Sequence, residues 1–417
     1  MIIVQDVIIA QKEQEKEQED RNMQYKENWE ETKQKYIDYW HQRNTGRPLM
    51  RIIARKPEIE HLSDGKAHEG SVADVFCQGM NYDLPEELKW KDMEDKYRNA
   101  DRVVARYRDF CEKHLFLGEA YPNLDIHYGP GSAAAYLGSE IGFEEDTIWF
   151  EPCVEEWEDA PDLVFDPENK WLKDHLAFVK RCRELVGDDM IVDMPDMMEN
   201  LDVLSSLRGA QELMMDLIED PDEICRRVKQ VTEAYFEFYE RFHELVVDKD
   251  GGNTWSCFQL WAPGRYAKLQ CDASAMISAD AFREFVLDSL KEQCEKLDYA
   301  LYHLDGPGAI KHVDALMEID GIKALQWTPG DSGPDGTCPD WDPIYDKVVA
   351  AGKSLWIKIY SGDTVEEWIA NMDRLVQKYG SARLFFYLPE MSLEWAEKLL
   401  DYAEKNWRDV KGTFFEK

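Results

Sequence analysis

A histidine and an aspartate two positions apart, His303 and Asp305, are the residues of this sequence best suited to chemistry. They end an apolar run and precede Gly306 and Pro307. Residues two apart on a strand point to the same side, so the imidazole and the carboxylate should share a face. Such a pair binds a metal ion, or acts as a general base with the group that orients it. The alternative is a hydrogen bond that only shapes the turn.

A further carboxylate, Glu390, follows the last apolar run of the chain and could complete this site. Its alternative is an exposed carboxylate ahead of the helix that starts at Ser392, where negative charge suits the helix dipole. His303, Asp305 and Glu390 are thus the predicted catalytic residues and the candidate metal ligands.

The C-terminal part of the chain must position these residues, and it repeats one pattern: an apolar run, a polar or Gly-rich break, then an amphipathic helix. The runs are Tyr299 to Leu304, Ile322 to Trp327, Ser354 to Ile359 and Arg383 to Leu388. Strands that alternate with helices at this spacing indicate parallel βα units, whose functional groups gather at the carboxyl ends of the strands.

Further apolar runs extend the series to eight candidate strands. The earlier ones lie near Leu49, Leu124, Met190 and Thr254, the last running to Ala262. The count predicts an α/β fold, a single (β/α)8 TIM-type barrel with helical insertions. Residues 11–20 are all Gln, Glu, Lys or Asp, so we expect residues 1–22 to form a charged extension, disordered or helical, and the barrel domain to occupy residues 23–417.

Aromatic residues at or near the strand ends could line a pocket for an organic substrate, although each one taken singly suits a hydrophobic core better. They are Trp255, Trp261, Tyr302, Trp327 and Tyr360. Asp193, at the end of the run near Met190, is a further candidate for substrate binding.

Composition excludes several classes of partner. A net charge of −36 would repel nucleic acid and anionic membrane surfaces. The nine cysteines have no CxxC pairs, which predicts reduced thiols in a cytoplasmic protein, and we see no export signal. No nucleophile elbow, P-loop or HExxH motif is present.

The segment from Tyr302 to Ala309, followed by Gln326-Trp327-Thr328-Pro329-Gly330, resembles the uroporphyrinogen decarboxylase superfamily, which includes cobamide-dependent methyltransferases. The resemblance also involves Cys271-Asp272-x-Ser274 and Asp202 with Arg208-Gly209, and it extends from about Lys26 to the C-terminus. It implies one βα barrel with its pocket at the carboxyl ends of the strands.

The chain departs from the superfamily at its functional positions. Thiol methyltransferases of this type hold zinc with His-x-Cys-Gly and a late cysteine, whereas this chain has His303-Leu304-Asp305-Gly306 and no cysteine near Glu390. Carboxylates make a harder site, which would hold zinc less tightly than thiolates do, so the candidate cofactors are zinc or another divalent metal, and an acid/base pair without a metal is the alternative. The decarboxylases use an Arg-Gln-Ala-Gly-Arg segment to bind acidic side chains; here Arg51 and Arg55 are the candidates for contacting carboxylates, but the motif itself is absent.

The resemblance implies a methyltransferase that moves a methyl group between a small methylated compound, a corrinoid protein or a one-carbon acceptor. Two alternatives stay open. One is a decarboxylase of a tetrapyrrole or another carboxylated substrate, and the other is a barrel that binds a corrinoid or tetrapyrrole without chemistry.

Overall fold

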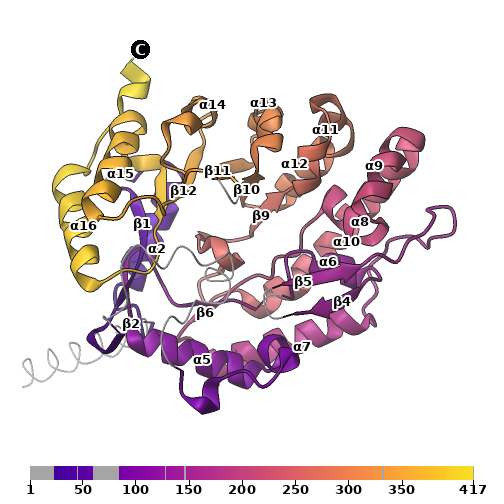
Figure 1. Cartoon of the computed structure of the whole chain (residues 1–417), viewed down its shortest axis with the longest axis horizontal. Helices are drawn as coiled ribbons and strands as arrows, with labels where there is room; N and C mark the ends of the chain where they lie inside the picture. The colour runs from indigo at the N-terminus through magenta and orange to yellow at the C-terminus, as the bar shows by residue number, and fades with distance from the viewer. Residues whose placement is uncertain are drawn as a thin grey trace, which may run out of the picture.

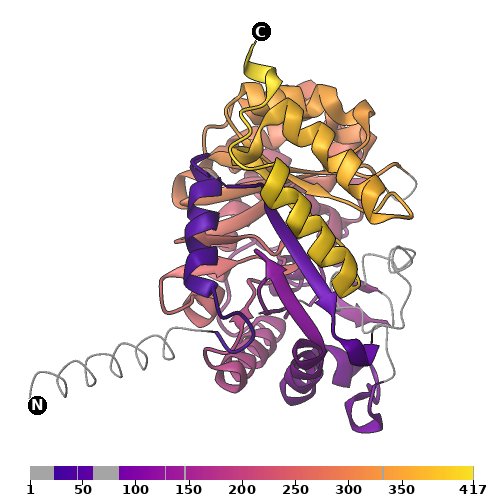
Figure 2. The ribbon, with the colours of Figure 1, turned by 90° about the vertical axis from the view of Figure 1, so that its left-hand side faces the viewer.

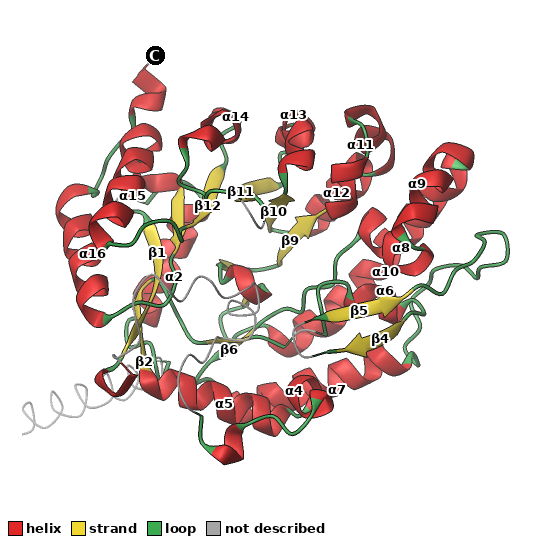
Figure 3. Cartoon of the chain, viewed as in Figure 1, coloured by secondary structure: helices red, strands yellow, loops and turns green. Residues whose placement is uncertain are grey.

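The computed structural model describes residues 23–44, 46–59, 84–126, 128–144, 147–330 and 333–416. Its centre is a mostly parallel sheet of seven strands in the order β2-β1-β13-β12-β11-β10-β9, which curves through the molecule (Figure 3). The strands of this sheet are β1 (Leu49–Arg55), β2 (His114–Gly118), β9 (Tyr266–Gln270), β10 (Tyr299–Asp305), β11 (Ile322–Thr328), β12 (Ser354–Lys358) and β13 (Leu384–Tyr387). Only β2 is antiparallel to its neighbour. An α/β fold is therefore confirmed.

The four C-terminal strands lie where the apolar runs predict them, and the helices that follow β9 to β13 lie on the outer side of the curved sheet (Figure 1). These helices are α11 (Ala279–Phe285), α12 (Leu287–Lys296), α13 (Val313–Met317), α14 (Asp342–Ala350), α15 (Val365–Tyr379) and α16 (Leu393–Asn406). The start of α15 is fixed by a capping box between Thr364 and Glu367.

The predicted strand from Thr254 to Ala262 is wrong. This stretch folds into β7 (Gly252–Thr254), a 3-10 turn and β8 (Trp261–Pro263), an antiparallel pair outside the main sheet. The strand beside β10 is β9 instead. In β9, the buried polar residues Lys268 and Gln270 interrupt the apolar pattern by which the other strands are recognised.

The strands near Leu124 and Met190 are present but only two residues long, as β3 (Asn123–Leu124) and β6 (Ile191–Val192), and they pair in parallel with each other. Pro122 precedes β3 and Pro195 lies just after β6, and proline limits ladder hydrogen bonds. Among the described residues no ladder joins this pair to the seven-stranded sheet, so the strand pairing does not show a closed ring.

Helix α2 (Trp29–Trp40) packs along one side of the molecule, where Figure 2 shows it in indigo. Its aromatic residues hold it to the strands, because the Tyr39 hydroxyl donates to the Leu355 carbonyl at 3.2 Å and the Trp40 indole to the Trp261 carbonyl at 2.8 Å. The predicted extension, residues 1–22, lies outside the described residues.

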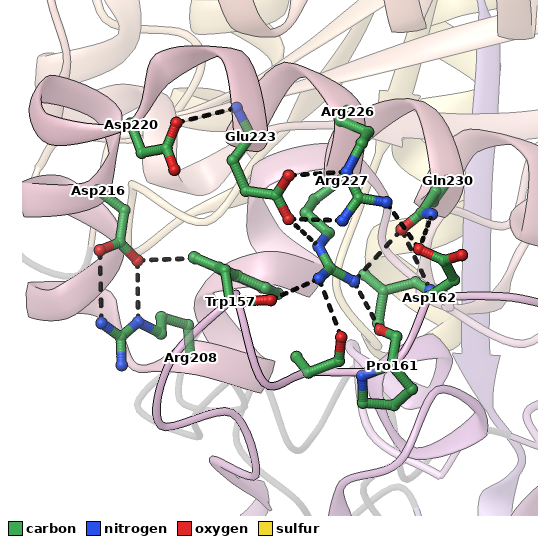
Figure 4. A network of polar contacts seen from close by, with 12 residues as sticks. Trp157, Pro161, Asp162, Arg208, Asp216, Asp220, Glu223, Arg226, Arg227 and Gln230 are labelled. Carbon is green, nitrogen blue, oxygen red and sulfur yellow. Dashed lines mark hydrogen bonds and ion pairs between the residues drawn. The ribbon is translucent and has the colours of Figure 1, made fainter.

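The middle of the chain is largely helical, as α4 (Met93–Arg98), α5 (Ala100–Lys113), α6 (Ser132–Tyr136), α7 (Lys170–Val186), α8 (Asn200–Arg208), α9 (Ala210–Glu219) and α10 (Pro221–Val246), with a hairpin of β4 (Glu140–Phe143) and β5 (Ile148–Glu151). Buried Arg227 of α10 ties the loop before α7 to this layer (Figure 4). It pairs with Glu223 at 2.7 Å and donates to the carbonyl of Trp157 at 2.8 Å.

Within the described ranges, no helix has both the length and the apolar content needed to cross a membrane.

Candidate active site at the carboxyl ends of β9 and β10

The polar group at the ends of β9 and β10 consists of Asp272, His303 and Asp305. One ligand atom from each of these half-buried side chains lies within 4.8 Å of the others. Asp272 follows β9 after one residue, and Asp305 is the last residue of β10. His303 and Asp305 therefore lie together at the end of β10, and the carboxylate of Asp272, just after the neighbouring strand β9, lies beside them.

Strand register explains why these side chains meet. His303 is paired with Gln270 of β9 on one side and with Gln326 of β11 on the other, and Asp305 is paired with Thr328. Because side chains alternate along a strand, the paired residues project from the same face of the sheet.

His303 is oriented by its neighbours on β11 and in the loop after β7. Its Nδ1 forms a hydrogen bond with Oε1 of Gln326, while Nε2 of Gln326 donates to the hydroxyl of Thr328 at 2.8 Å. The ring also contacts the edge of Phe258, with centroids 5.4 Å apart. Burial and the ammonium of Lys268 lower the pKa of His303, which favours the neutral imidazole.

Asp272 is held through its backbone by the start of α8. Asp202 accepts the N–H groups of Asp272 and Ala273, each at 2.8 Å, and Glu199 accepts the N–H of Gln270 at 2.7 Å. The segment is strained at Asn200, whose φ is 46°, and Met198 before it has a φ of 52°. Residues held in this left-handed region cost free energy and often mark functional sites.

Carboxyl groups outnumber cations around this site. Buried Lys268 pairs with Asp196 at 2.6 Å. Burial raises the pKa of Asp272 to about 6, with Lys268 opposing the rise and Asp305 adding to it. Burial, and then the charge of Asp272, raises the pKa of Asp202 to about 7. A bound cation would therefore stabilise the ionised carboxylates of this site.

Glu390 does not join this group. Its carboxylate lies 3.2 Å from Nε2 of His114 and 3.6 Å from Nη1 of Arg55, beside β1 and β2. The assignment of Glu390 as the third member is corrected, because the strand end at β13 directs it toward β1 and not toward β10. Asp272 takes that place.

Most of the predicted aromatic wall lies in the hydrophobic core. Tyr302 and Trp327 alternate with His303 and Gln326 along their strands and so point to the other face of the sheet, each 1% exposed. Trp255 stacks on Tyr239 of α10.

Trp261 packs against Trp29 of α2, again in the core. Tyr360 is the exception, since it is half-buried and its hydroxyl donates to the Gly333 carbonyl at 3.3 Å. The core alternative therefore describes the four others better than a substrate wall does.

Arg51 and Asp193 are buried, Arg51 within β1 and Asp193 directly after β6. Arg51 donates to the Gln259 side chain at 2.5 Å and to the Leu388 carbonyl at 2.9 Å, and its guanidinium lies over the ring of Tyr387. Asp193 accepts from the Asn123 amide at 2.9 Å, and burial, followed by the charge of Asp125, raises its pKa. Neither residue lies among the three potential metal ligands.

The residues missed from the sequence are mainly those of β9. Lys268, Gln270 and Asp272 alternate at the spacing of one strand face, and this periodicity was the available signal. The thiol of Cys271, between Gln270 and Asp272, is a poor nucleophile because burial raises its pKa.

Comparison with solved structures shows which known fold this chain is similar to. The chain is similar to a structure described as a methyltransferase from Methanosarcina mazei, with a TM-score of 0.55 and 14% sequence identity, over 90% of this chain and 98% of that one. No protein-family model matches the chain, and a search of curated proteins finds no match. At this identity the likeness concerns the fold.

Proposed function

We propose that this chain is a methyltransferase of the uroporphyrinogen decarboxylase superfamily type, acting on a small methylated compound with a corrinoid protein or one-carbon compound as the other partner. The observation that carries the proposal is the group Asp272, His303 and Asp305 at the strand ends, in a fold similar to that of a methyltransferase.

We also infer that β3 and β6 complete, with β1 and β9 to β13, a ring of eight parallel strands.

A divalent metal, such as zinc, fits the three side chains. Carboxylate oxygens and an imidazole nitrogen are ordinary ligands of zinc, and three protein ligands leave a position open for substrate. Oδ1 of Asp272 is buried and has no hydrogen-bond partner among the described residues, as expected of an atom reserved for a cation. A bound metal would supply Lewis-acid activation of a substrate atom.

The side chains around this position have separate roles in the proposal. His303 and Asp305 would bind the metal or, without one, act as base and orienting carboxylate. Asp202 and Glu199 would hold Asp272 in place through the backbone.

A carboxylated substrate is favoured by Arg51. Arg51 is 9% exposed, and no carboxylate in the described part of the chain forms an ion pair with it. A buried guanidinium without a counter-charge is costly, so an anionic group of a ligand would stabilise it. This is the reason to keep the decarboxylase as the second candidate.

The test is a methyl-transfer assay on the purified chain. Reduced cob(I)alamin is offered with methanol, methylamines, methylated thiols or methoxylated aromatic acids, and methylcobalamin is followed by absorbance. We expect transfer from one class of donor and its loss in His303→Ala. Carbon dioxide release from a carboxylated compound would support the decarboxylase instead. Equal turnover by wild type and His303→Ala would contradict the assigned site.

A further inference from the structure

Gln326 of β11 is paired with His303 of β10 and contacts its ring. We propose that Gln326 is a positioning residue, which holds the proton of His303 on Nδ1 and leaves the lone pair of Nε2 directed to the site. The inference deepens the proposed function, since it states which nitrogen serves as ligand or base. It rests on the contacts of His303, Gln326 and Thr328.

The first step concerns the direction of the amide. Nε2 of Gln326 donates to the Thr328 hydroxyl at 2.8 Å, so Oε1 of Gln326 faces His303. An amide oxygen only accepts hydrogen bonds, and its partner, Nδ1 of His303, must therefore carry a proton.

The second step concerns the other ring nitrogen. Because Nδ1 donates its proton to the amide oxygen of Gln326, Nε2 is the nitrogen whose lone pair can serve as a ligand or a base. No hydrogen bond to Nε2 occupies this lone pair among the described residues.

The third step concerns rigidity. His303 and Gln326 are paired residues on adjacent parallel strands, and Thr328 stands two residues further on the same strand as Gln326. The sheet thus fixes the distance between ring and amide, and the hydroxyl fixes the rotation of the amide. Partners of this kind determine the tautomer of a metal-binding histidine, and their loss lowers metal affinity by about 10- to 100-fold.

Two measurements test the proposal on the whole chain. In metal-free protein, ¹⁵N NMR of the histidine rings should show His303 protonated at Nδ1 in wild type and a shift toward the Nε2–H form in Gln326→Leu. Titration with Zn²⁺ should show about 10- to 100-fold weaker binding in Gln326→Leu, with most affinity restored in Gln326→Glu because a carboxylate also accepts from Nδ1.

The matched control is Gln293→Leu, which removes a buried glutamine of α12 that no hydrogen bond joins to His303. Its His303 tautomer and Zn²⁺ affinity should equal those of wild type. If Gln326→Leu does not fold, Thr328→Val tests the same network with a smaller expected loss.

An Nε2–H tautomer in wild type, or equal Zn²⁺ affinity in Gln326→Leu and Gln293→Leu, would overturn the proposal. Absence of methyl transfer with the Nδ1–H tautomer intact would count against the proposed function alone.

Discussion

Two polar clusters lie at strand ends of the same sheet, and they differ in how their charge is balanced. At β13 and β1, the Glu390 carboxylate lies beside the guanidinium of Arg55 and the ring of His114. At β9 and β10, Asp272 and Asp305 face each other and a histidine whose pKa is lowered. The first cluster places an arginine of the protein beside its carboxylate, whereas the second has two carboxylates that a bound cation would stabilise.

The difference teaches that position at a strand end does not define a ligand site. Both clusters satisfy the expectation that polar groups gather at the carboxyl ends of parallel strands. The surrounding charges decide which cluster serves the fold and which one is available for a ligand. The comparison therefore predicts opposite outcomes for equivalent substitutions in the two places.

The largest effect is expected from Asp272→Ala. A structural zinc site yields about 10–16 kcal/mol over four ligands, so one ligand is worth about 3 kcal/mol, and Zn²⁺ affinity should fall about 100-fold. Calorimetric titration with Zn²⁺ measures this affinity. The fold should be retained, since the half-buried carboxylate contributes little to the core. Unchanged affinity in Asp272→Ala would remove this residue from the site.

An intermediate effect, of the opposite kind, is expected from Glu390→Gln. Arg55 and His114 would lose a carboxylate in a buried setting, and the free energy of unfolding should drop by about 2 kcal/mol. Urea denaturation monitors the drop, and Zn²⁺ affinity should stay that of wild type. A variant with native stability and lost metal binding would reverse the assignment of the two clusters.

A smaller effect is expected from pH. Because burial raises the pKa of Asp272 to about 6, protons compete with the metal below that pH. Affinity for Mn²⁺ should increase about tenfold between about pH 5 and pH 7, as the carboxyl group loses its proton. Calorimetry at several pH values follows this. A constant affinity over that range would show that Asp272 is ionised throughout and that burial does not raise its pKa.

The sequence predicts the four C-terminal strands of the sheet and two of the three residues of the candidate site. The runs that become β10, β11 and β12 are apolar and regular, and His303 with Asp305 follows from strand periodicity. Strand β9 was missed because Lys268 and Gln270 are buried polar residues whose partners come from distant parts of the chain, and so was Asp272 beyond it.

The fate of Glu390 could not be predicted for a related reason. Its partner Arg55 is on β1 and His114 on β2, far away in the sequence, and only the pairing of β13 with β1 brings them together. Tyr302 and Trp327 do not line a pocket beside His303, because strand alternation turns them to the opposite face of the sheet.

Anomalous X-ray diffraction from crystals soaked in Zn²⁺ tests the central claim most directly. We predict a peak within about 2.3 Å of ligand atoms of Asp272, His303 and Asp305, with Nε2 as the nitrogen ligand, and no peak beside Glu390. A peak between Glu390 and His114, or an empty site at Asp272 under saturating Zn²⁺, would contradict the account.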